Sequence, residues 1–120
     1  ELLEKVRMAA AGTAAAYGAT AEVILPGVVI PAAVYDEDLV AELAGTIREV
    51  LGDECLARDC GGGGEDFHFF KKERPPLRAA SFGVGAGCTP GLHARNMTID
   101  ETQLDMGVRV LTAAALKHVG

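Results

Sequence analysis

Apolar residues recur every three or four positions in three stretches of the chain, which is the period of an α-helix. The first stretch covers residues 3–17 and stops at Gly18, a residue that commonly ends helices. The second covers residues 37–51 and follows Asp36, which is a preferred helix N-cap. The third follows Asp100 and completes the chain. The spacing predicts that its buried stripe consists of Leu104, Val108, Leu111 and Ala115.

Other stretches carry the marks of extended chain. Residues 21–25 and 77–84 are short apolar runs bounded by Pro and Gly, and we expect strands there and over residues 55–58. A short helix is predicted over residues 65–72, before Pro75-Pro76. The predicted order is α-β followed by α-β-α-β-α. Helices alternating with strands in this way favour a layered α/β fold.

Composition and charge exclude several classes of protein. The chain of 120 residues holds 11 basic and 17 acidic residues, for a net charge of −6, and its longest basic run is two lysines. Nucleic-acid binding needs a clustered basic patch, so we expect no nucleic-acid partner. No apolar run approaches the ~20 residues of a membrane span, so we expect no membrane partner either. Three cysteines without a C-x-x-C pair indicate free thiols in a reducing cytoplasm.

Four consecutive glycines, residues 61–64, run directly into Glu65 and Asp66. Glycine loses more backbone freedom on folding than any other residue, so a run of four needs a reason. A phosphate-binding loop is a weak explanation, because the two carboxylates would repel phosphate and the P-loop lysine is missing. Two readings remain open for the carboxylates: they complement the dipole of a following helix, or one of them faces a binding site.

His93 lies in a glycine-rich loop that follows the predicted strand over residues 77–84. Loops at strand ends are where α/β folds usually place ligand-binding groups. A catalytic zinc needs about three protein ligands, and no H-E-x-x-H or similar spacing joins His93 to other candidates. From these residues alone, a metal site is incomplete.

Two motifs nevertheless resemble a known family. Residues 62–67, G-G-G-E-D-F, resemble the G-G-E-D-F motif of metal-dependent amidohydrolases of peptidase family M20, most closely the aminoacylase-like group that acts on N-acyl amino acids. Residues 90–93, P-G-L-H, followed by M-T-I-D-E at 97–101, are similar to that group's G-L-H-[ST]-P-x-[FM]-x-x-D-E segment. The family's Ser/Thr-Pro is replaced here by residues 94–96, A-R-N. Residues 14–23 are similar to the end of the family's small inserted domain.

The resemblance implies a division of the chain between two domains. Residues 1–27 would be the last helix and strand of a small α+β domain, which serves as a lid or as a dimerisation module, so a homodimer through it is one expectation. Residues 28–120 would be the C-terminal part of a zinc-peptidase-like α/β catalytic domain. The chain begins in helical rhythm without a cap, which fits a fragment of a longer polypeptide.

The resemblance also implies a chemistry: hydrolysis of the amide bond of N-acyl amino acids or small peptides by water activated on a pair of divalent metals, Zn or Mn. His93 would be a metal ligand, and Gly63, Gly64, Glu65 and Asp66 would border the substrate. The other ligands and the general-base glutamate would lie upstream, so no catalytic residue is expected in this chain, and the isolated chain is expected to be inactive. The alternative is a small α/β binding or interaction module without catalysis.

Overall fold

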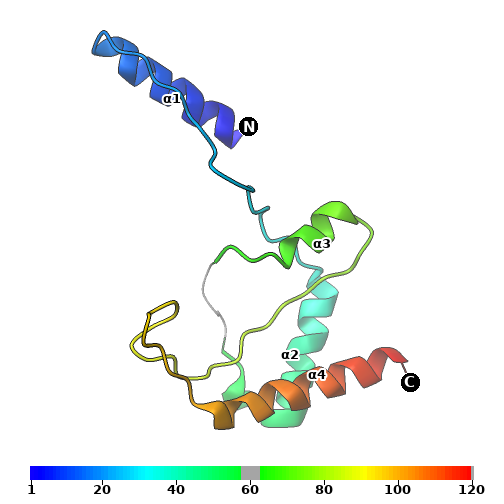
Figure 1. Ribbon diagram of the computed structural model, residues 1–120. Helices are drawn as coiled ribbons and strands as arrows, with labels where there is room; N and C mark the ends of the chain where they lie inside the picture. The colour runs from blue at the N-terminus through cyan, green and yellow to red at the C-terminus, as the bar shows by residue number, and fades with distance from the viewer. Residues whose placement is uncertain (58–62, 120) are drawn as a thin grey trace. The chain divides into compact units, whose positions relative to one another are not determined.

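The computed structural model describes residues 1–57 and 63–119 (Figure 1). Contacts within the chain divide it into two units, Glu1–Ile30 and Pro31–Gly120. Each unit is described by itself below. No helix in the described ranges combines the length and the apolar character that a bilayer crossing requires.

The first unit holds one helix and an extended segment. Helix α1 spans Leu2–Ala16, and none of its residues is buried. The N–H of Ala19 donates to the carbonyl of Ala14 at 2.9 Å, across Gly18, whose φ of 68° is in the left-handed region that favours glycine. The predicted helix and its stop at Gly18 are therefore confirmed. Residues 19–30 follow without regular structure.

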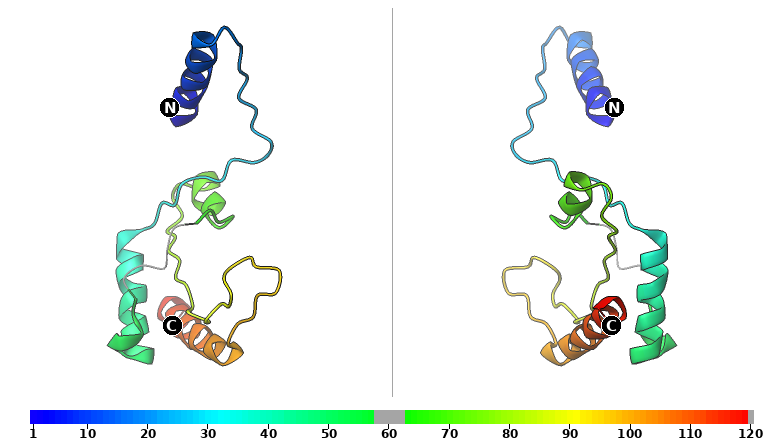
Figure 2. Two further views of the ribbon diagram at one scale, coloured as in Figure 1. Left: turned by 90° about the vertical axis from the view of Figure 1, so that its left-hand side faces the viewer. Right: turned by 90° about the vertical axis from the view of Figure 1, so that its right-hand side faces the viewer.

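The second unit contains the remaining helices of the described part of the chain (Figures 1 and 2). In chain order they are α2 (Glu37–Leu51), the 3-10 turn η1 (Asp53–Cys55), α3 (His68–Glu73), the 3-10 turn η2 (Glu101–Gln103) and α4 (Leu104–Val119).

The predicted cap of α2 is present, and Asp100 caps the 3-10 turn η2, which continues directly into α4. The Asp36 carboxylate accepts a hydrogen bond from the N–H of Leu39 at 2.9 Å, which satisfies one of the free donors at the start of α2. The Asp100 carboxylate accepts from the N–H of Thr102 at 3.0 Å and from the amide of Gln103 at 2.9 Å. These hydrogen bonds stabilise the ionised carboxylate, and the pKa of Asp100 is lowered, mainly by the hydroxyl of Thr102.

Helices α2 and α4 pack against each other and form the core of the second unit (Figure 2). Val110 of α4 is only 1% exposed, and Ala114 lies one turn further along the same face. Opposite them, Thr46 of α2 is completely buried and donates its hydroxyl to the carbonyl of Glu42 at 3.0 Å. The local backbone bond removes the cost of burying an unpaired hydroxyl.

Polar contacts fix the direction in which the two helices run. Arg109 of α4 donates to the carbonyl of Val50 at the end of α2, at 2.8 Å. Further along α4, Lys117 donates to the hydroxyl of Thr46 at 2.9 Å and to the carboxylate of Glu49 at 2.7 Å. Later residues of α4 thus meet earlier residues of α2, and the pairing is antiparallel in sense.

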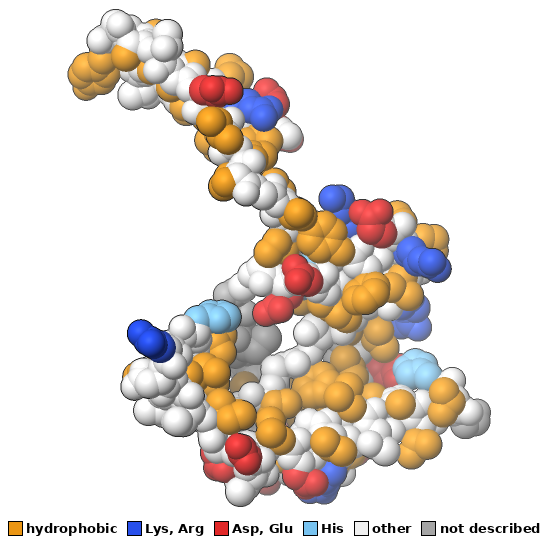
Figure 3. Space-filling view, viewed as in Figure 1, with side chains coloured by type: hydrophobic (Ala, Val, Ile, Leu, Met, Phe, Trp, Pro, Cys, Tyr) orange, Lys and Arg blue, Asp and Glu red, His pale blue; other side chains and the backbone are white. Residues whose placement is uncertain are grey.

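The face of α4 predicted to be buried is the wrong one. Leu104, Val108 and Leu111 are 46%, 63% and 58% exposed, and Ala115 is exposed as well. The buried residues of the helix are Gly107, Val110 and Ala114. Gly107 allows close approach on this face, because a Cβ there would lie 2.9 Å from Val84 Cγ2. Figure 3 shows hydrophobic side chains at the surface of this unit.

The predicted α/β class is also wrong, because no strand is present in the described residues. The segments expected as strands, 21–25 and 77–84, carry no sheet pairing, and the described part of the 55–58 segment begins in a 3-10 turn. Among the described residues, the single β-type contact is an isolated antiparallel bridge between Thr89 and Thr98. A strand exists only where a neighbour pairs its N–H and C=O groups, and local sequence cannot supply that neighbour.

Candidate functional site

The loop that carries His93 is closed at its base by two threonines. The N–H of Thr89 donates to the carbonyl of Thr98 at 3.0 Å, and the reverse bond measures 2.8 Å. Beyond this pair, the N–H of Asp100 donates to the carbonyl of Ala86 at 2.8 Å. Because Asp100 also caps η2, the loop is joined directly to the start of the helical segment that continues as α4.

His93 occupies a constrained position at the end of this loop. The N–H of Ala94 donates to the carbonyl of Gly91 at 3.2 Å, which closes a turn with His93 at its third position. The φ of His93 is 65°, a left-handed conformation that is uncommon for a residue with a side chain. Its side chain is exposed. Non-glycine residues at positive φ are often found at functional sites, and histidine is among the residue types that adopt this region most readily.

A second turn follows at once, in the segment that departs from the family motif. The N–H of Met97 donates to the carbonyl of Ala94 at 3.0 Å, so Arg95 and Asn96 are the two central residues of that turn. Arg95 is exposed. The loop therefore presents an imidazole and a guanidinium two residues apart.

The glycine-carboxylate segment is described from Gly63 onward, and the earlier part of the motif, including Gly62, lies outside the described residues. Gly63, Gly64, Glu65 and Asp66 are all exposed. Helix α3 begins at His68, three residues later than predicted, and has no acidic residue in its first turn. Both carboxylates therefore precede the helix, and the backbone carbonyls of Glu65 and Asp66 accept hydrogen bonds from the N–H groups of His68 and Phe69.

A cluster of rings follows this segment. His68 is buried at 6% exposure, and its ring makes edge contacts with Tyr35 at 5.6 Å and Phe67 at 6.3 Å between centroids. Phe67 and Phe70, by contrast, are 38% and 61% exposed. His68 acts here as a packed ring that anchors α3.

The described residues do not assemble a metal site by themselves. Nowhere in residues 1–57 and 63–119 do three or more His, Cys, Asp or Glu side chains gather in a way that could hold a metal ion. A catalytic zinc takes about three protein ligands and an open position. His93 offers a suitable nitrogen donor, but it supplies one ligand at most.

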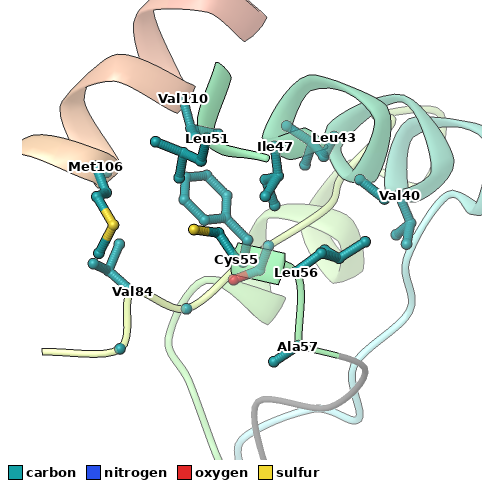
Figure 4. A pocket seen from close by; sticks show the side chains of 16 residues that line it. Val40, Leu43, Ile47, Leu51, Cys55, Leu56, Ala57, Val84, Met106 and Val110 are labelled. Carbon is teal, nitrogen blue, oxygen red and sulfur yellow. The ribbon is translucent and has the colours of Figure 1, made fainter. Parts of the chain in front are cut away.

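Sequence reasoning missed an apolar pocket of about 500 Å³ in the second unit (Figure 4). Its walls come from α2, η1, the segments 56–57 and 81–85, and α4, and none of the described lining residues is charged. Of the three cysteines, Cys55 places its side chain at this pocket. The labelled side chains in the view are Val40, Leu43, Ile47, Leu51, Cys55, Leu56, Ala57, Val84, Met106 and Val110. Apart from the thiol of Cys55 and the hydroxyl of Ser81, the side chains of the described lining residues offer only apolar contact.

Comparison with known proteins gives one match. The family model described as peptidase family M20/M25/M40 matches residues 7–117. No curated protein and no solved structure matches the chain. The family match confirms the resemblance at the level of the family and does not single out the aminoacylase-like group.

Proposed function

Because the chain belongs to peptidase family M20/M25/M40, we propose that it is part of a metal-dependent amidohydrolase that cleaves N-acyl amino acids or small peptides. The observation that carries this proposal is the family match, which covers residues 7–117. The exposed histidine held at φ 65° supports it, because it lies in the motif that suggested a metal ligand.

In this proposal His93 is one metal ligand, contributed by the loop that the hydrogen bonds between Thr89 and Thr98 close. A divalent metal, when bound, supplies activation of water near neutral pH and polarisation of the amide carbonyl. In this proposal the further ligands and the general base come from outside the described residues, in which no three His, Cys, Asp or Glu side chains gather to hold a metal ion. The isolated chain of 120 residues should then be inactive.

The segment from Gly63 to Asp66 borders the substrate in this proposal. A Cβ placed on Gly63 would meet no atom within 4 Å, so this glycine is not required by packing within the described chain. Its small size is explained if a substrate lies close to the backbone there. Glu65 and Asp66 are exposed beside it and can accept hydrogen bonds from substrate N–H groups.

A hydrolysis assay tests the proposal. The intact enzyme that contains this chain should release free amino acid from N-acetyl amino acids when supplied with Zn²⁺ or Mn²⁺, and the isolated 120 residues should release none. Loss of turnover on chelation should be reversed by adding the metal back. An intact protein that hydrolyses neither N-acyl amino acids nor small peptides with either metal would favour the non-catalytic binding module instead.

A further inference from the structure

Arg95 is the basic side chain closest in sequence to His93. It is the only lysine or arginine between Arg78 and Arg109. Within the described ranges it forms no ion pair with a carboxylate, whereas Arg7, Arg48 and Arg78 all do. The guanidinium is therefore available to an external anion.

His93 and Arg95 lie in two consecutive turns, each closed by a backbone hydrogen bond. His93 is the third residue of the turn closed by Gly91 and Ala94, and Arg95 is the second residue of the next turn, closed by Ala94 and Met97. The bonds between Thr89 and Thr98 close the loop below both turns. The imidazole and the guanidinium are thus presented by one short, hydrogen-bonded loop.

The substrates of the proposed function carry a group that such a cation can bind. An N-acyl amino acid carries a carboxylate next to the amide that is cleaved. The chain has a net charge of −6, and two of its 17 acidic residues, Glu65 and Asp66, lie in the segment proposed to border the substrate. Like charges would repel the substrate unless a cation compensated them. A guanidinium binds a carboxylate through two parallel hydrogen bonds, which fixes orientation as well as charge.

We propose that Arg95 binds the α-carboxylate of the substrate and thereby sets a preference for N-acyl amino acids over their uncharged amides. This inference rests on the proposed function. Arg95 touches the substrate away from the bond that breaks, so its contribution is mainly to binding. Loss of a hydrogen bond to a charged group should then raise KM roughly 10- to 100-fold with little change in kcat.

The test compares two substrates that differ only in this charge, an N-acetyl amino acid and the corresponding N-acetyl amino acid amide, in the intact enzyme. Arg95→Gln should raise KM for the acid and leave KM for the amide unchanged. For the acid, Arg95→Lys should have a KM between those of the wild type and Arg95→Gln, because lysine keeps the positive charge but cannot donate the two parallel hydrogen bonds of a guanidinium. Arg48→Gln, which removes an exposed guanidinium from α2, serves as the matched control and should change neither KM.

The outcomes separate the two proposals. If Arg95→Gln affects acid and amide equally, or affects neither, the assignment of Arg95 is overturned while the hydrolase proposal stands. If the wild-type enzyme cleaves neither substrate, the proposed function has failed, and the role of Arg95 falls with it. The thermal melting curve of each variant shows whether it is folded. If Arg95→Gln fails to fold, the same comparison of acid and amide is made with Arg95→Lys.

Discussion

Arg78 donates two hydrogen bonds to the carboxylate of Asp36, from Nε at 3.0 Å and from Nη2 at 2.8 Å. The same carboxylate caps α2 through Leu39, and the backbone N–H of Asp36 donates to the carbonyl of Ala79 at 2.9 Å. One residue thus joins the start of α2 to a segment 42 positions later in the sequence. The bonds from Arg78, followed by the N–H of Leu39, lower the pKa of Asp36 to about 2.

This pair predicts a pH-dependent stability. The pKa of Asp36 falls from 3.8 to about 2 on folding, so its ionised form stabilises the native state above about pH 4, and this stabilisation is lost as the pH falls towards 2. Asp36→Asn should therefore lower the melting temperature at pH 7. The gap between variant and wild type should close as the pH is lowered from 5 to 2.

Thermal melting across that pH range checks the prediction. Asp53→Asn is the matched control, because Asp53 also pairs with an arginine but its side chain is 84% exposed, against 24% for Asp36. The control should shift the melting temperature much less. A gap between Asp36→Asn and wild type that stays constant from pH 7 to pH 2 would show that the ionised carboxylate is not what stabilises this contact.

Two valines on α4 test which face of that helix is buried. Val110 is 1% exposed and Val108 is 63% exposed. Val110→Ala removes the equivalent of two buried methylene groups and should reduce the free energy of unfolding by about 1.5 kcal/mol. Val108→Ala should change it by less than about 0.5 kcal/mol. Urea denaturation measures both, and equal losses would contradict the observed packing of α4 on α2.

Substituting Gly63 tests whether this glycine is needed for activity rather than for stability. A Cβ at this position meets no atom within 4 Å, and the same holds for Gly45 within α2. Gly63→Ala should therefore leave the melting temperature unchanged and reduce kcat/KM of the intact enzyme, because the added methyl displaces the substrate from the backbone. A reduction of about 10-fold or more is expected, since a displacement of 1 Å can cost about 100-fold.

Gly45→Ala is the control for that experiment and should raise the stability slightly while leaving kcat/KM unchanged, because alanine is favoured over glycine within a helix. If Gly63→Ala retains full activity, Gly63 does not border the substrate.

Features that depend on residues close together in the sequence, such as helix ends, could be predicted. The cap at Asp36 and the stop at Gly18 depend on residues within one helical turn, and both are present. The buried face of α4 could not be chosen in this way, because the helix is apolar on more than one side. Leu104 and Val108 compete with Val110 and Ala114, and only the contact with α2 decides between them.

Contacts between distant residues could not be predicted. The apolar run over residues 77–84 indicates extended chain, but a strand also needs a neighbouring strand, and none is present in the described residues. The pairing of Arg78 with Asp36 and the pocket beside α2 likewise depend on the tertiary fold. For the candidate site, the motif identified His93, but no feature of the sequence showed that its φ would be 65°.

The measurement that tests the central claim most directly is the metal content of the intact enzyme with and without the His93 imidazole. His93→Gly is the suitable variant, because glycine adopts φ 65° without strain and preserves the turn. Removing a direct ligand should cost at least the roughly 10- to 100-fold in metal affinity that loss of an outer partner costs. Elemental analysis should therefore find less bound metal in His93→Gly, and wild-type content in the control His118→Ala. Unchanged metal stoichiometry in a folded His93→Gly enzyme would contradict the account.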